Sequence, residues 1–183
     1  MERWTYEKLA RSDPGTLEQV MRQGITPEFS DLIGWEFRGF NQPYITRILG
    51  FQKFKKGFFV APGQNPGGPE FSGYNVPVVQ NGLYGKWLAL PDEDNPKRYG
   101  FYRAYRVKPD ERDNKYPNAL LLNYGIARNG LNPARLLRDY LIQVDTGNPD
   151  LFLGEASFAI GSLRVFPSHF VLERYNKVED TIR

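Results

Sequence analysis

The sequence predicts a single mainly β domain, an antiparallel sheet that closes into a barrel of about 8–10 strands or splits into a sandwich. Three observations predict this class. Aromatic residues make up 15% of the 183 residues, and aromatic side chains fit a pleated, half-buried surface. Most of the chain consists of short runs in which apolar and polar residues alternate, which is the period of a β-strand. Glycine (18) and proline (14) supply the frequent turns that such a sheet needs.

One amphipathic helix is expected before the sheet, over residues 14–23. Ser12 or Asp13 can cap its first turn, and Pro14 suits the first helical position because its missing N–H would have no partner there. The apolar residues share one face, namely Leu17, Val20 and Met21. Gly24 is expected to end the helix in a left-handed conformation. The helix is therefore expected to close one end of the sheet.

Strands are expected in nine runs, over residues 32–40, 53–60, 74–79, 82–90, 98–107, 119–127, 140–145, 152–160 and 164–174. So many strands favour a closed barrel over one open sheet, and closure also removes exposed edges. Glycines in or beside the runs, such as Gly73 and Gly154, are expected at bulges or bends. No linker divides the chain, so we expect one domain made of a helical segment, a barrel and a tail, at residues 1–27, 28–176 and 177–183.

Composition excludes several kinds of protein. The formal net charge is only +3, and basic residues are scattered among acidic ones, so a nucleic-acid partner is not expected. The absence of cysteine excludes disulfides, thiolate zinc sites and cysteine nucleophiles. The first residues contain no apolar run typical of a secretory signal, and no stretch reaches the roughly 20 apolar residues of a membrane-spanning helix. We therefore expect a cytoplasmic protein without integral membrane contact.

His169 is the only histidine in the chain. A multi-histidine metal site is therefore impossible, no metal site is expected, and the sequence lacks the G-x-S-x-G elbow that would accompany a serine nucleophile. One imidazole suffices as an axial haem ligand, so haem remains the one cofactor that the residue could hold. The alternative is a strand histidine that packs or hydrogen-bonds locally.

Aromatic residues and arginines alternate in the run over residues 98–107. Because successive strand residues face opposite sides, Arg103 lies on one face and Tyr102 on the other. An inward Arg103 would need a carboxylate partner or an anionic ligand, whereas an inward Tyr102 would give an aromatic, hydroxyl-bearing interior. Catalytic residues cannot be assigned before the strand order is known. The candidate ligand-binding residues are Trp35, Phe37, Tyr74, Trp87, Tyr102, Arg103, Tyr124 and His169.

Two segments carry a resemblance to a known family. Residues 24–27 (GITP) with 31–39 (DLIGWEFRG) resemble the opening of calycin-like small β-barrels, closest to the bacterial GXWXG/DUF4334 type, and residues 137–145 with 170–174 are similar to its closing strands. The resemblance implies a lipocalin-like barrel whose last strand pairs with the first, with Trp35 over the closed end. Calycins commonly bind small apolar molecules inside the barrel, a haem-binding branch uses a late-strand histidine near the position of His169, and some lipocalin-like barrels are isomerases or cyclases.

The leading hypothesis is a barrel that encloses a small hydrophobic or amphipathic ligand, fatty-acid-like, with its polar end met by an arginine. A second is a lipocalin-like enzyme, an isomerase or cyclase, that uses tyrosine, arginine or glutamate as acid or base on a hydrophobic metabolite. A third is haem binding through His169, and a fourth is an interaction module without a pocket. The sequence does not determine the oligomeric state.

Overall fold

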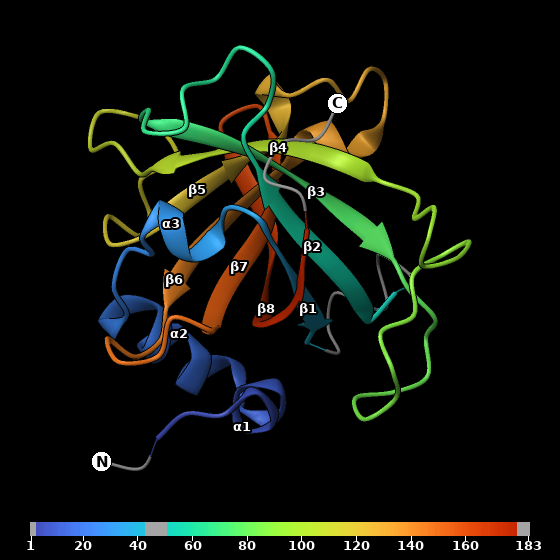
Figure 1. Cartoon of the computed structure of the whole chain (residues 1–183). Helices are drawn as coiled ribbons and strands as arrows, with labels where there is room; N and C mark the ends of the chain where they lie inside the picture. Colours follow the sequence, from blue (N-terminus) through green and yellow to red (C-terminus); the bar gives the residue numbers. More distant parts are fainter. Residues whose placement is uncertain (1–2, 43–50, 179–183) are drawn as a thin grey trace.

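The computed structural model of the chain describes residues 3–42 and 51–178. Eight antiparallel strands form a closed barrel in which each strand pairs with the next and β8 pairs with β1 (Figure 1). The mainly β class, the closed barrel and the return of the last strand to the first are thereby confirmed. The strands are β1 (Trp35–Asn41), β2 (Lys53–Phe59), β3 (Glu70–Pro77), β4 (Tyr99–Arg106), β5 (Leu120–Asn123), β6 (Leu137–Gln143), β7 (Leu151–Ile160) and β8 (Leu163–Lys177).

The prediction of a strand over residues 82–90 is wrong. This segment forms a loop along the outer wall, and its only recorded pairing within the described chain is an isolated bridge from Ala89 to Val78. Gly82 has a φ of 78°, a left-handed conformation that interrupts an extended run. The run over residues 119–127 ends as a strand at Asn123, whose side chain caps the 3₁₀ turn η1 (Tyr124–Ile126) by accepting a hydrogen bond from Gly125 N. Residues 179–183 of the expected tail lie outside the described residues.

The expected helix is confirmed as α2 (Pro14–Gln23), with the Asp13 side chain accepting hydrogen bonds from two backbone N–H groups of the first turn. A second helix, α1 (Tyr6–Arg11), was not predicted because six residues are too few for a periodic pattern. The left-handed conformation expected at Gly24 is wrong, since its φ is −66°. A Cβ there would lie 2.5 Å from the Ile142 side chain, so glycine allows the close approach of the helix end to β6.

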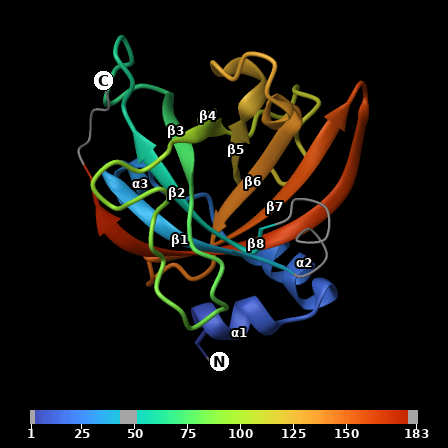
Figure 2. The ribbon, with the colours of Figure 1, turned by 90° about the vertical axis from the view of Figure 1, so that its right-hand side faces the viewer.

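The three helices cover different parts of the barrel (Figures 1 and 2). The first two lie together below the strands in both views, with α1 against β8 and α2 against β7. The short α3 (Phe29–Leu32) instead buries Leu32 among the interior residues, with the Phe29 ring centroid 4.6 Å from that of Phe71. Trp35 lies at this end, with the Arg174 guanidinium 4.5 Å from its ring centroid. Within the described residues, no helix has the length and hydropathy to cross a membrane.

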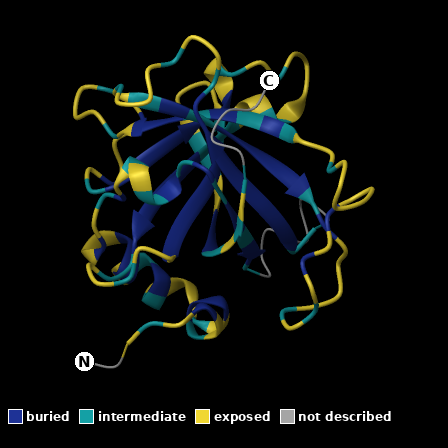
Figure 3. Ribbon diagram, in the orientation of Figure 1, coloured by how far each residue is buried: buried dark blue, intermediate teal, exposed yellow. Residues whose placement is uncertain are grey.

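The barrel interior is packed with aromatic side chains, and Figure 3 shows the strands buried and the connecting loops exposed. The Phe37 ring centroid lies 5.5 Å from that of Phe58 and 5.3 Å from that of Phe152, edge to face. Gly154 does not mark a bulge, because the register shift of β7 lies between Ala156 and Phe158. A Cβ on Gly154 would lie 2.2 Å from the ring of its partner Phe170. The glycine thus makes room for an aromatic ring lying across the sheet.

Candidate functional site

The register decides which face of β4 points inward. Tyr102 lies inside, 1% exposed, and its hydroxyl donates to the Gly57 carbonyl at 3.0 Å. Arg103 lies outside, where it forms an ion pair with Glu70. Of the two alternatives that the alternation left open, the aromatic, hydroxyl-bearing interior is the one observed. The arginine of this strand is therefore available only to the outer surface.

A lysine occupies the centre of the aromatic interior. Lys56 Nζ donates to Asp139 Oδ2 at 3.1 Å and to the Tyr124 hydroxyl at 2.7 Å, and that hydroxyl donates to Asp139 Oδ2 at 2.9 Å. Four ring centroids lie 4.7–5.7 Å from the ammonium, those of Phe54, Tyr102, Tyr124 and Phe170. Burial lowers the pKa of Lys56, and the Asp139 carboxylate opposes this. Burial also raises the pKa of Tyr124 above its ordinary value.

The cavity beside this lysine is small, about 50 Å³. Sites for drug-sized ligands usually measure about 300–1,000 Å³, whereas one water needs roughly 15 Å³. Asp139 Oδ1 has no hydrogen-bond partner within the described part of the chain and belongs to a residue that lines the cavity. The cavity thus has room for about three water molecules, but not for the chain of a fatty acid.

Sequence analysis did not single out Lys56 or Asp139, although a signal was present. In the run from Phe54 to Phe58, alternate residues share a face, so the phase places Lys56 beside two inward phenylalanines. The three lysines among residues 53–56 are, however, also typical of a solvated hairpin end. Asp139 stands in the same relation to its neighbours Leu137 and Leu141 on β6.

The structure does not bring the candidate ligand-binding residues into one site. On the inward face of the barrel or in its interior cluster are Trp35, Phe37, Tyr102 and Tyr124. The other four lie on the outer side, namely Tyr74, Trp87, Arg103 and His169. Trp87 belongs to the loop mistaken for a strand, and its ring centroid lies 3.7 Å from Lys53 Nζ on the outer wall.

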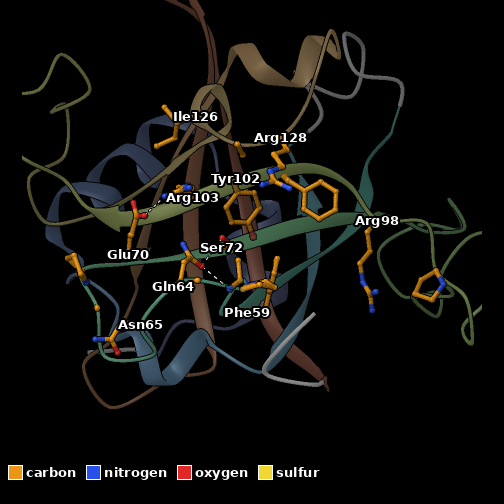
Figure 4. A pocket seen from close by; sticks show the side chains of 18 residues that line it. Phe59, Gln64, Asn65, Glu70, Ser72, Arg98, Tyr102, Arg103, Ile126 and Arg128 are labelled. Atoms are coloured by element: carbon orange, nitrogen blue, oxygen red, sulfur yellow. Dashed lines mark hydrogen bonds and ion pairs between the residues drawn. The ribbon is translucent and has the colours of Figure 1, made fainter. Parts of the chain in front are cut away.

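A larger pocket of about 840 Å³ lies outside the barrel, over β3 and β4 (Figure 4). Its apolar floor includes Phe59 and Phe101, which point outward from β2 and β4. Its sides come from the loop before β3 and from the segment after η1, so residues far apart in sequence meet there. The polar side chains that line it are Gln64, Asn65, Glu70, Ser72, Arg98, Arg103 and Arg128. We call this pocket the outer groove.

Hydrogen bonds hold both sides of the outer groove in place. Gln64 Oε1 accepts from Ala61 N at 2.8 Å and from the Ser72 hydroxyl at 2.9 Å, which fastens the loop to β3. On the other side, Asn129 accepts from Phe101 N at 2.9 Å and donates to the Phe101 carbonyl at 2.7 Å. Because the walls are fastened to the barrel, a ligand would not have to order them on binding.

The outer groove carries an excess of positive charge. Three arginines line it against one glutamate, and that glutamate pairs with Arg103. The guanidinium of Arg98 lies 5.0 Å from the Tyr74 ring centroid. Within residues 3–42 and 51–178, no ion pair to a carboxylate is recorded for Arg98 or Arg128. Cations above an aromatic floor suit a ligand with an apolar body and an anionic end.

His169 lies on the outer wall of β8, and it lines neither the interior cavity nor the outer groove. Its Nε2 atom lies 3.8 Å from Glu155 Oε2 and 3.9 Å from Glu18 Oε2. Lys115 Nζ donates to both oxygens of Glu155, at 2.6 and 2.8 Å. These surroundings are charged and narrow, and none of the described pockets offers a haem-sized space beside the imidazole.

Comparisons with protein-family models, curated proteins and solved structures find no match to this chain. The eight-stranded antiparallel barrel is consistent with a calycin-like fold. The narrower resemblance to the GXWXG/DUF4334 type receives no support from these comparisons.

Proposed function

We propose that this protein binds a small amphipathic anion, a molecule with an apolar body and a carboxylate or similar end, in the outer groove. The observation that carries the proposal is the combination of a phenylalanine floor with two arginines, Arg98 and Arg128, for which no carboxylate partner is recorded within the described residues. The proposed ligand is of the class expected from the sequence, a small amphipathic molecule whose polar end is met by an arginine. The site moves from the barrel interior to its outer face, because the interior cavity measures only about 50 Å³.

The chemistry of the outer groove accounts for both ends of such a ligand. A guanidinium donates paired N–H groups to a carboxylate, and charge-assisted hydrogen bonds contribute roughly 1.5–3 kcal/mol each. An apolar body that covers about 100 Å² of the floor adds roughly 2.5 kcal/mol, at about 25 cal/mol per Å². Phe59 and Phe101 supply that floor. Affinity and preference for an anion thus come from different residues and can be separated.

Octanoate and 1-octanol test the proposal, since they differ mainly in the charge at one end. Calorimetric titration of the full chain is expected to show octanoate binding, with octanol weaker by roughly tenfold or more. The double variant Arg98→Ala/Arg128→Ala is expected to lose this preference. Arg112→Ala is the matched control, because Arg112 is exposed and does not line the outer groove.

Three results would contradict the proposal. The first is no binding of either probe by the wild-type protein, together with no molecule extracted from freshly purified protein and seen by native mass spectrometry. The second is an undiminished preference for octanoate in the double arginine variant. The third is binding that is lost in Lys56→Met but retained in the double arginine variant, which would place the ligand inside the barrel.

A further inference from the structure

Three side chains with metal-binding atoms converge beneath α2, on the wall of the barrel away from the outer groove. Glu18 comes from α2, Glu155 from β7 and His169 from β8. One ligand atom from each lies within 4.8 Å of the others. The convergence depends on the packing of α2 against β7. Since 150 residues lie between Glu18 and His169 in the sequence, no local motif indicates it.

One nitrogen of the imidazole in this cluster, Nε2, lacks a hydrogen-bond partner in the described part of the chain. His169 Nε2 is buried and unpaired within the described residues, and its side chain is only 10% exposed. The two nearest carboxylate oxygens lie 3.8 and 3.9 Å away, on Glu155 and Glu18, beyond hydrogen-bond distance. Imidazole is the commonest side-chain ligand of metal ions in proteins, and a buried ring nitrogen without a partner is free to act as one.

A cation already occupies part of this space. Lys115 Nζ lies 2.6 Å from Glu155 Oε2 and 3.7 Å from Glu18 Oε2. The Tyr116 hydroxyl lies 2.5 Å from Glu18 Oε2 and 2.8 Å from Glu155 Oε2, but its one proton can be donated to only one of them. Arg22 pairs with the other oxygen of Glu18 at 2.6 Å, so a divalent cation that replaces the Lys115 ammonium would add one positive charge to a cluster that is already balanced. The Lys115 side chain is 41% exposed, so it can leave for solvent without a new burial cost.

We propose that Glu18, Glu155 and His169 form a binding site for a divalent transition metal of the Zn²⁺ class, from which Lys115 is displaced. Imidazole nitrogen and carboxylate oxygen are both zinc ligands, at about 2.0–2.2 Å. In a tetrahedral site such bonds separate the ligand atoms by about 3.4 Å. The two distances from His169 therefore need to close by roughly 0.4–0.5 Å, and the distance between the two carboxylates, which is at most 4.8 Å, by up to about 1.4 Å.

The site adds a second function to the outer surface and does not depend on the proposed function of the outer groove. Three ligands with one position left over resemble catalytic zinc sites more than closed structural ones. Metal bound here would also join α2 to two barrel strands, and would thereby stabilise the folded chain. The expectation that no metal site exists rested on the lone histidine and considered only multi-histidine and thiolate sites.

Titration of the metal-free full chain with Co²⁺ and Zn²⁺ at pH 7.5 tests the proposal. We expect one Co²⁺ per chain with a tetrahedral visible absorption band, which Zn²⁺ abolishes, and a rise in unfolding temperature that saturates. His169→Ala is expected to weaken binding by more than roughly tenfold, since loss of an outer-shell partner alone costs about 10–100-fold. Glu18→Gln, on the surface of α2, should also weaken binding, whereas Lys115→Met should strengthen it severalfold. Glu111→Gln is the control, because this carboxylate pairs with Lys108 away from the site.

The outcome is decisive in each case. Absence of binding at 1 mM metal, a concentration far above roughly micromolar sites, in both the wild type and Lys115→Met would show that the cluster is an ordinary salt-bridge network. Binding that His169→Ala and Glu18→Gln leave unchanged would place the metal elsewhere. If His169→Ala fails to fold, Glu18→Gln and Lys115→Met still decide, because they change affinity in opposite directions.

Discussion

Replacement of Asp139 by asparagine removes the one carboxylate that, among the described residues, contacts the buried Lys56 ammonium. The side chains of Lys56 and Asp139 are 2% and 4% exposed, so water screens the pair very little. Asparagine keeps the shape and one oxygen acceptor but not the charge. Breaking a buried ion pair by removing one partner costs about 3–5 kcal/mol, and the surrounding rings and the Tyr124 hydroxyl offset part of that. We expect Asp139→Asn to lower the free energy of unfolding by about 3 kcal/mol.

Urea unfolding followed by tryptophan fluorescence measures the effect. With a slope of about 2 kcal/mol per molar urea, the midpoint should fall by roughly 1.5 M. The double variant Lys56→Met/Asp139→Asn removes the unpaired charge, and neutral replacement of a buried pair is often without cost. It should therefore be more stable than Asp139→Asn alone. A loss below about 1 kcal/mol in the single variant, or a double variant less stable than the single one, would refute the reasoning.

The pair of Lys56 and Asp139 also makes the free energy of unfolding depend on pH. Burial lowers the pKa of Lys56 in the folded protein, whereas a lysine in the unfolded chain titrates near 10.4. Between these values the unfolded chain binds more protons than the folded one, so stability rises with pH. The loss of Asp139 lowers the folded value further. The deficit of Asp139→Asn against the double variant should therefore shrink as the pH rises towards about 10, and a deficit that is constant from pH 7 would contradict this.

The remaining predictions concern local packing and capping. Gly154→Ala places a Cβ 2.2 Å from the Phe170 ring and should lower the free energy of unfolding by about 1–3 kcal/mol. Gly147→Ala is the control and should leave stability unchanged, because no atom lies within 4 Å of its Cβ. Equal urea midpoints for the two variants would contradict this. Asp13→Ala removes the cap of α2 and should lower the unfolding temperature. Hydrogen bonds from the first turn lower the pKa of Asp13, so its stabilisation, present above the unfolded value, should vanish as pH falls through the folded value.

The architecture could be predicted from local patterns, because both periodicity and capping are local properties. The helix at residues 14–23 follows from Asp13, Pro14 and three apolar residues on one face, and eight of the nine expected strands correspond to strands of the barrel. Residues 82–90 mimic a strand because Trp87 and Ala89 are buried against the outer wall while their neighbours are exposed. Alternating burial is thus not specific to a strand, since a loop that lies on a sheet can produce it.

The sites depend on contacts that no local pattern encodes. The outer groove forms because the loop before β3 and the segment after η1 lie on either side of it. A hydrogen bond between Gln64 and Ser72 holds the loop, and hydrogen bonds of Asn129 hold the segment. The cluster of Glu18, Glu155 and His169 requires α2 to pack on the barrel wall. Lys56 and Asp139 alone were within reach of sequence reasoning, through the phase of their strands.

The filled interior bears directly on where ligands bind. In a hollow barrel the inward side chains leave a cavity between them, whereas here the rings of Phe37, Phe58 and Phe152 contact one another in the interior. Enlarging the cavity of about 50 Å³ to a ligand site would remove core side chains, at about 3–5 kcal/mol for each phenylalanine deleted. The outer groove has no such cost, because the space above Phe59 and Phe101 is already open and no core side chain has to be removed. A rigid core with fastened surface loops therefore favours binding on the outside of this barrel.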